Sequence, residues 1–217
     1  MGGILILPGR DEQKLKETLA LLKGSGHQLY STDLLIEKHR IDLVEQLPQL
    51  DGIVHSAGIV KTLPVKFLDQ EKINETLSIN YEIPVLLMAD IMRKKKLNAK
   101  ASVVFISSIA SQHPYRGGAV YAGAKAAIEA FSKSIALETS NGIRSNCISP
   151  AMIKTPMYDM SEEKAGKEVM DAHIKQYPLG LGYPEDVANT AIFLLSEASR
   201  WITGITITLD GGYLLEK

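Results

Sequence analysis

This sequence of 217 residues is poor in cysteine, in long apolar runs and in net charge of either sign. Cys147 is the one cysteine, which excludes an intrachain disulfide and is typical of a protein from a reducing compartment. No stretch approaches the ~20 consecutive apolar residues that a membrane span needs. A net charge of −1 argues against general binding to nucleic acid or to a membrane surface.

Signals for secretion and for several domains are lacking as well. The N-terminus has neither the basic segment nor the long apolar core of a signal peptide. The chain is 45% apolar and 23% charged, an ordinary globular composition, and no linker or repeat divides it. The sequence therefore predicts one soluble, cytoplasmic domain over residues 1–217, which binds a small molecule rather than nucleic acid or membrane.

The histidines have no metal-ligand spacing. His27, His39, His113 and His173 are widely separated in the chain, so we expect surface or loop roles for them and no metal site. Cys147 lies on a predicted strand and is expected to be a small core residue.

What the sequence does contain is an alternation of short apolar runs and helical patterns. Runs of this kind, rich in Ile, Val or Leu, predict buried parallel strands with helices on both faces of the sheet. The predicted strands are "ILIL" from Ile4, "HQLYST" from His27, "GIVHSA" from Gly52, "SVVFIS" from Ser102, "RSNCIS" from Arg144 and "GITITL" from Gly204. The fold class is therefore α/β, a doubly wound (Rossmann-like), mostly parallel sheet whose ligand site lies beyond the carboxyl ends of the strands.

One segment interrupts this alternation with extra helix and turn. Residues 161–187 follow a late strand, where an insertion commonly covers the ligand crevice. We expect a lid on the substrate side with Gly180 and Gly182 as hinges, and an ordinary surface helix is the equal alternative.

The clearest chemical pattern is "YAGAK". On a helix, Tyr121 and Lys125 project from one face, about 5–6 Å apart at their Cβ atoms. A nearby ammonium favours the phenolate, so this tyrosine can act as general acid and base on a carbonyl and alcohol pair.

The tyrosine and lysine pair is weak evidence by itself. A second pair with the same spacing, Tyr213 and Lys217, ends the chain and is assigned no function. Ser108 distinguishes the first pair, because it lies thirteen residues before Tyr121 at the carboxyl end of the "SVVFIS" strand. Position 200, the equivalent place before Tyr213, is Arg200.

With these residues in place, the sequence resembles the classical short-chain dehydrogenase/reductases. The segments that carry the likeness are "VVFISSIAS", "YAGAKAAIEAFSKSIALE", "IRSNCISPAMIKTPM", "PEDVANTAIFLLSEASRWITG" and "ITLDGG", in the order found in the family. The likeness runs from about Arg10 to Gly212, and the nearest type is the 3-oxoacyl-acyl-carrier-protein reductases.

The resemblance implies a catalytic tetrad. Tyr121 would be the acid and base, Ser108 would bind the substrate oxygen, and Lys125 would lower the tyrosine pKa and hold the nicotinamide ribose. Asn80, in "SINYEIP", would anchor a water in the proton relay. Each residue also has a purely structural alternative, such as a strand-end hydroxyl or a helix cap. Their joint occurrence in the family order favours the site.

The resemblance also implies NADP or NAD as cofactor. Thr155 would face the carboxamide, "HSAG" at His55–Gly58 would lie beside the adenosine, and Asp33 would lie near the adenine. Arg10 stands where NADP-preferring members bind the 2′-phosphate, whereas Asp33 favours an unphosphorylated ribose, so preference stays open. The cofactor-binding set is Arg10, Asp33, Leu34, Ser56, Ala57, Gly58, Tyr121, Lys125, Pro150, Ile153 and Thr155.

The opening stretch departs from the family. Its first strand corresponds to the family's second, and the usual Gly-rich strand, loop and helix do not precede it, which gives about six strands, one fewer than the norm. Because an empty central place would leave buried backbone groups unsatisfied, we expect Ile4–Leu7 to pair directly with the Ile53–His55 strand. "PGRDEQ" would then replace the phosphate loop, with one glycine and two acidic residues, and NAD(P) binding is expected to be weak.

Three hypotheses about the chain follow from these observations. The first is a reductase that interconverts a carbonyl and an alcohol. The second is a cofactor-free, catalytically impaired remnant that serves as a binding or oligomerisation module. The third is a fragment from a mis-set start codon at Met1. A homodimer or homotetramer is expected, because the "VYAGAKAAIEAFSKSIALE" helix is apolar or small on nearly every face and family members associate through it.

Overall fold

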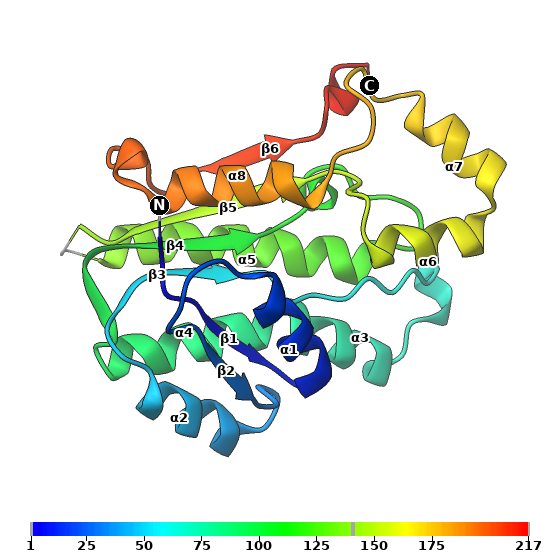
Figure 1. Ribbon diagram of the computed structural model, residues 1–217. Helices are drawn as coiled ribbons and strands as arrows, with labels where there is room; N and C mark the ends of the chain where they lie inside the picture. Colours follow the sequence, from blue (N-terminus) through cyan, green and yellow to red (C-terminus); the bar gives the residue numbers. More distant parts are fainter. Residues whose placement is uncertain (1, 140–141, 217) are drawn as a thin grey trace. The chain divides into compact units, whose positions relative to one another are not determined.

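Each of the predicted strands forms in the computed structural model, which describes residues 2–139 and 142–216 (Figure 1). The strands are β1 (Ile6–Gly9), β2 (Gln28–Ser31), β3 (Leu50–His55), β4 (Leu97–Ile106), β5 (Arg144–Pro150) and β6 (Thr206–Leu209). β1 begins two residues later than "ILIL" and includes Pro8, which a strand tolerates at an edge. Met1 and Lys217, on which the start-codon hypothesis and the second tyrosine and lysine pair depend, lie outside the described residues.

Helices connect the strands, as the alternating pattern predicts. They are α1 (Glu12–Leu21), α2 (Glu37–Gln46), α3 (Gln70–Leu77), α4 (Ile83–Arg93), α5 (Ala119–Glu138), α6 (Pro156–Ala165), α7 (Lys167–Ile174) and α8 (Pro184–Leu195). Two short helices matter for the site: η2 (Ser78–Glu82), a π-helix, and η3 (Ile109–Ser111), a 3₁₀-helix. None of the described helices combines the length and the apolar character that crossing a membrane requires.

The chain forms two compact units. Unit 1 comprises Met1–Gln49 and Leu86–Lys96, and unit 2 comprises Leu50–Val85 and Leu97–Lys217. The expectation of one domain over residues 1–217 stays a prediction.

Unit 2 contains a four-stranded parallel sheet in the order β3-β4-β5-β6. Neighbouring side chains along a strand point to opposite faces of the sheet, so alternate residues show which helix covers which face. Ser145 of β5 bonds Ser132 of α5, whereas the next side chain back, Arg144, donates to the Leu194 carbonyl of α8. Helices α5 and α8 therefore cover opposite faces of the sheet, as the doubly wound fold predicts (Figure 1).

The core of unit 2 lies between this sheet and its helices. All seven residues of β5 are buried, including Cys147, as expected for a central parallel strand. Val104 and Ile148 on the α8 face pack against Ala191 and Leu194. On the other face Phe105 packs edge-on against Phe131 of α5.

Unit 1 contains a two-stranded parallel sheet, β1 with β2. Its most buried polar contact is an ion pair between α2 and α4, in which Arg40 Nε lies 2.6 Å from Asp90 Oδ2. Both side chains of that pair are only 6% exposed. Arg93 adds a second contact to Asp90 at 2.8 Å from the exposed side of α4.

The expected pairing of Ile4–Leu7 with the Ile53–His55 strand stays a prediction, because the two segments belong to different units. Within unit 1, β1 pairs with β2, and within unit 2, β3 pairs with β4.

The segment expected to form a lid contains α7 and the turns that follow it. Gly182 forms an isolated parallel bridge with Ile153, and its carbonyl accepts a 2.8 Å bond from the Lys154 N–H. Gly180 has a positive φ of 76°, which favours glycine. A lid function stays a prediction.

Candidate active site

Ser108 lies directly beyond the carboxyl end of β4, at the N-terminal cap of η3. Its Oγ accepts a hydrogen bond from the Ala110 N–H at 3.2 Å, which turns the chain away from the strand. Parallel strands direct such end residues toward the ligand edge of a sheet. The backbone of Ser108 therefore lies at the carboxyl end of the strand, as its position in the sequence predicts.

Tyr121 and Lys125 lie one turn apart in α5, as their spacing predicts. The Lys125 Nζ lies 5.7 Å from the centre of the Tyr121 ring and donates a 2.8 Å hydrogen bond to the Ile106 carbonyl at the end of β4. Lys125 is 95% buried, so this backbone bond anchors an amine that has left bulk water.

Burial dominates the acid–base properties of both residues. It lowers the pKa of Lys125 to about 8, because the charged ammonium is poorly solvated there. It raises the pKa of Tyr121 to about 12, and a side-chain hydrogen bond with Ser108 opposes that rise. Desolvation therefore sets the direction of the Tyr121 pKa shift, and the hydrogen bond places Ser108 beside Tyr121. A lowering of the tyrosine pKa by Lys125 stays a prediction.

Asn80 lies in the π-helix η2, a helix type often found at functional sites. Its side chain is buried, and Nδ2 donates to the Ile59 carbonyl at 3.0 Å and to the Thr76 carbonyl at 2.9 Å. Oδ1 accepts from the Ile59 N–H at 3.2 Å. The amide thus holds the loop that follows β3, and its role with a water stays a prediction.

Gly58 lies close to α5. A Cβ at Gly58 would lie 2.9 Å from Asn80 Oδ1 and 3.5 Å from Lys125 Nζ. A side chain here would therefore fill the space beside the lysine. Ser56 and Ala57 precede it on the same loop, and both are exposed.

The other predicted residues of unit 2 follow β5. Pro150 ends that strand, and Ile153 forms the bridge to Gly182. Thr155 caps the N-terminus of α6, and its Oγ1 donates to the Ile153 carbonyl at 3.2 Å. The threonine hydroxyl is thus held in place by its own loop.

A tyrosine that sequence analysis did not single out borders the site. Tyr115 packs against Gly118 at the start of α5, where a Cβ would come within 2.7 Å of the Tyr115 ring. Its charge raises the pKa of Tyr121, which places the two phenols near each other. The signal in the sequence was its position six residues before Tyr121, between Ser108 and the helix that contains Tyr121.

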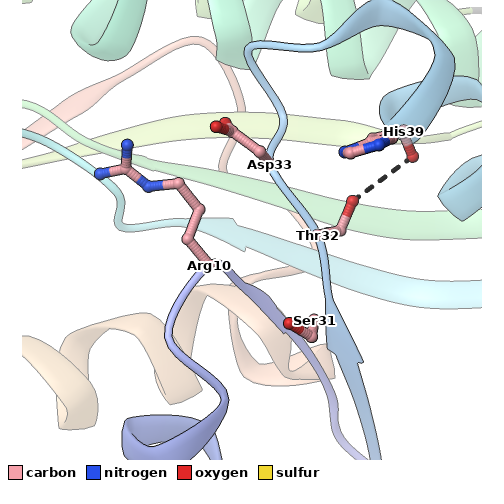
Figure 2. Close-up of a pocket in the computed structure, with 5 residues that line it drawn as sticks. All are labelled: Arg10, Ser31, Thr32, Asp33 and His39. Atoms are coloured by element: carbon pink, nitrogen blue, oxygen red, sulfur yellow. Dashed lines mark hydrogen bonds between the residues drawn. The ribbon is translucent and has the colours of Figure 1, made fainter.

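Unit 1 has a pocket of about 300 Å³ beyond the carboxyl ends of β1 and β2 (Figure 2). Arg10 and Asp33 both line it, as the cofactor set predicts, and Leu34 follows in the turn after β2. The Asp33 carboxylate also accepts the Leu35 N–H at 3.0 Å. Three further lining residues were not predicted: Ser31, Thr32 and His39.

Comparison with known proteins identifies the family of this chain. The family model described as enoyl-(acyl carrier protein) reductase matches residues 2–214. The 3-oxoacyl-[acyl-carrier-protein] reductase FabG of Rickettsia felis is 32% identical over 218 residues, which cover 99% of this chain and 88% of that protein. Dehydrogenase/reductase SDR family member 4 of Pongo abelii is 31% identical, over 97% of this chain and 78% of that one.

Solved structures agree with the sequence relatives. A short-chain dehydrogenase/reductase from Mycobacterium ulcerans superposes with a TM-score of 0.88 at 30% identity, covering 99% of this chain and 82% of that chain. A Brucella melitensis structure titled short-chain dehydrogenase/reductase SDR:Glucose/ribitol dehydrogenase has a TM-score of 0.89 at 28% identity, with 98% and 86% covered. This chain belongs to the short-chain dehydrogenase/reductase family and is an oxidoreductase similar to the 3-oxoacyl-acyl-carrier-protein reductases.

Proposed function

We propose that this protein is an NAD(P)-dependent reductase that interconverts a carbonyl and an alcohol, with a 3-oxoacyl thioester as the substrate class. The convergence of Ser108 with Tyr121, above the buried amine of Lys125, carries the proposal. The names of the sequence relatives supply the substrate class.

The residues of unit 2 fit the nicotinamide end of a dinucleotide. Gly58 has no side chain that would come within 3.5 Å of Lys125 Nζ, and Lys125 and Thr155 would hold the ribose and the carboxamide. When bound, the cofactor supplies or accepts the hydride at the carbonyl carbon.

The chain's own side chains provide the proton chemistry. Ser108 donates a hydrogen bond to the substrate oxygen and keeps it next to the Tyr121 hydroxyl. In the reducing direction Tyr121 passes its Oη proton to that oxygen, and in the oxidising direction the phenolate takes the proton back. A protonated Lys125 favours the phenolate form.

The adenosine end would be held by unit 1. Arg10 would bind a 2′-phosphate through its guanidinium, and Asp33 would accept a hydrogen bond from an unphosphorylated ribose. The N-terminus of α1 is a poor pyrophosphate site. Its Asp11 carboxylate accepts the Lys14 N–H at 3.1 Å and places negative charge where a phosphate would bind, so affinity is low.

The test is a calorimetric titration of the protein with NADPH and with NADH, followed by reduction of acetoacetyl-coenzyme A. We expect weak binding and slow turnover that Tyr121→Phe abolishes. Micromolar binding would contradict the low affinity but support the enzyme. Binding without turnover of any 3-oxoacyl thioester would overturn the substrate class.

Asp11 also supports a second candidate, a cofactor-free module that binds a partner or a second copy. Its carboxylate fills the helix end that phosphate would use. If neither dinucleotide binds at millimolar concentration, this second candidate replaces the first.

We further propose that the protein is a cytoplasmic homo-oligomer. Family members are generally oligomeric. In α5, Leu137 is 88% exposed and Gly123 has open space beside it, so this helix retains an uncovered face. Light scattering should give a dimer or tetramer, and a monomer at high concentration would contradict the proposal.

A further inference from the structure

A buried carboxylate lies behind the catalytic serine. Glu129, one helical turn after Lys125 in α5, is 93% buried. Ser107 Oγ donates to its Oε1 at 2.6 Å, and Ser111 Oγ donates to the same oxygen at 2.7 Å. One carboxylate oxygen thus receives a hydroxyl from each side of Ser108.

Burying this carboxylate is costly. Among the described residues no lysine, arginine or histidine forms an ion pair with Glu129, and its carboxylate accepts hydrogen bonds from the hydroxyls of Ser107 and Ser111. The family's catalytic tetrad does not include this position. A buried carboxyl group without a cation beside it needs a reason other than general stability.

The geometry points to that reason. The backbone of residues 107–111 is held to β5 by one bond, from the Ser107 N–H to the Ile148 carbonyl at 2.7 Å. Within η3, the Ser111 N–H bonds the Ser108 carbonyl at 3.0 Å. The Glu129 bonds instead connect this segment to α5, the helix that carries Tyr121 and Lys125.

We propose that Glu129 is a positioning residue, which fixes the Ser108 hydroxyl relative to the Tyr121 hydroxyl by clamping the chain on both sides of Ser108. Ser107 Oγ also lies 3.2 Å from the Lys125 carbonyl oxygen, so the clamp reaches the lysine turn of the helix. The inference rests on the proposed reductase function and names a further residue of that same site.

Two substitutions separate position from charge. Glu129→Ala removes both bonds and lowers kcat by about 10- to 100-fold with little change in KM, because Ser108 loses its alignment with the reacting oxygen. Glu129→Gln keeps an acceptor oxygen for both serines and restores kcat to within about fivefold of the wild type. Equal losses in the two variants would overturn the clamp.

A double-mutant cycle tests whether Glu129 acts through Ser108. In a Ser108→Ala background, Glu129→Ala should cause little further loss of kcat, since the hydroxyl that it positions is already gone. Losses that multiply would show an effect independent of Ser108 and would contradict the proposal.

The matched control is Ser132→Ala. Ser132 lies in the same helix, is buried, and shares a 2.8 Å hydrogen bond with Ser145, away from Ser108. Like Glu129→Ala, Ser132→Ala removes buried hydrogen bonding from α5 and should lower the melting temperature, but it should leave kcat unchanged. A matching fall in kcat would mean that any weakening of α5 impairs the site.

Amide hydrogen exchange provides a readout that needs no activity. Glu129→Ala should speed exchange at residues 109–111 at least tenfold, with β5 unchanged, whereas Ser132→Ala should not. Unchanged exchange overturns the clamp. Faster exchange in a protein that reduces no carbonyl would uphold the clamp and reject the proposed function instead.

Discussion

The two units differ in how deeply their sheets are buried. In unit 2 every residue of β5 and a run of five in β4 are buried. In unit 1 neither strand has a fully buried residue, and α1 has none. The free energy of local opening is higher where a segment is more deeply buried. The residues proposed for catalysis therefore belong to the unit with the more buried sheet, and the predicted adenosine contacts belong to the unit with the more exposed one.

This contrast predicts different consequences for changes in the two units. Substitutions among the catalytic residues of unit 2 should change the rate of chemistry. Substitutions in unit 1 should change affinity or local stability and leave the rate at saturating cofactor intact.

The largest effect is expected for Tyr121→Phe. It removes the proton donor and should lower kcat by about 10²- to 10⁴-fold, the usual contribution of a general acid. Reduction of acetoacetyl-coenzyme A measures it, and circular dichroism should show an unchanged fold. Activity within twofold of the wild type would mean that another group, with Tyr115 the nearest phenol, transfers the proton.

A second test breaks the ion pair of unit 1. Arg40→Met leaves Asp90 buried with Arg93 as its remaining partner, and should destabilise unit 1 by about 3 kcal/mol. Hydrogen exchange should quicken in α2 and stay unchanged in β5. The control is Lys94→Met, which removes an exposed pair with Glu45 and should cost less than about 1 kcal/mol. Equal losses of stability in Arg40→Met and Lys94→Met would contradict the view that burial makes the first ion pair more important.

A third test follows the pH dependence of Lys125. Burial lowers its pKa from 10.5 to about 8, so between these values the unfolded chain holds a proton that the folded chain has lost. The wild type should therefore gain stability relative to Lys125→Met as pH rises from about 8 toward 10. Urea unfolding of both proteins measures the difference. A difference that stays constant over that range would contradict the shift.

The smallest effect concerns cofactor choice. Arg10→Ala should weaken NADPH binding about tenfold and leave NADH binding unchanged, because the guanidinium would bind only the 2′-phosphate. Asp33→Asn is the matched opposite and should weaken NADH binding. Calorimetry measures both. Equal weakening of both dinucleotides by Arg10→Ala would show that Arg10 binds a group common to them.

Strands such as β4 could be predicted because they contain short apolar runs, and β5, RSNCISP, because it fits the alternation of strands with helical patterns. Their pairing could not, because register and neighbours depend on contacts between distant segments. The expected contact of Ile4–Leu7 with β3 is of this kind, since it joins segments of different units.

The candidate site could be predicted in part. A spacing of four on a helix and a strand-end serine are local patterns, and they locate Tyr121, Lys125 and Ser108. The sign of the Tyr121 pKa shift depends on how much of the ring is buried, which spacing does not reveal. Glu129 had one available signal, a charged residue four positions after Lys125 and thus on the same side of the helix.

The buried position of Cys147 has a practical consequence. Burial raises the pKa of its thiol to about 11, so the reactive thiolate is scarce at neutral pH. Maleimide reagents should therefore leave this protein unlabelled until it unfolds. New cysteines placed at exposed sites, one in each unit, would carry fluorophores or spin labels without competition from the native thiol, and the untouched Cys147 would report unfolding in the same sample.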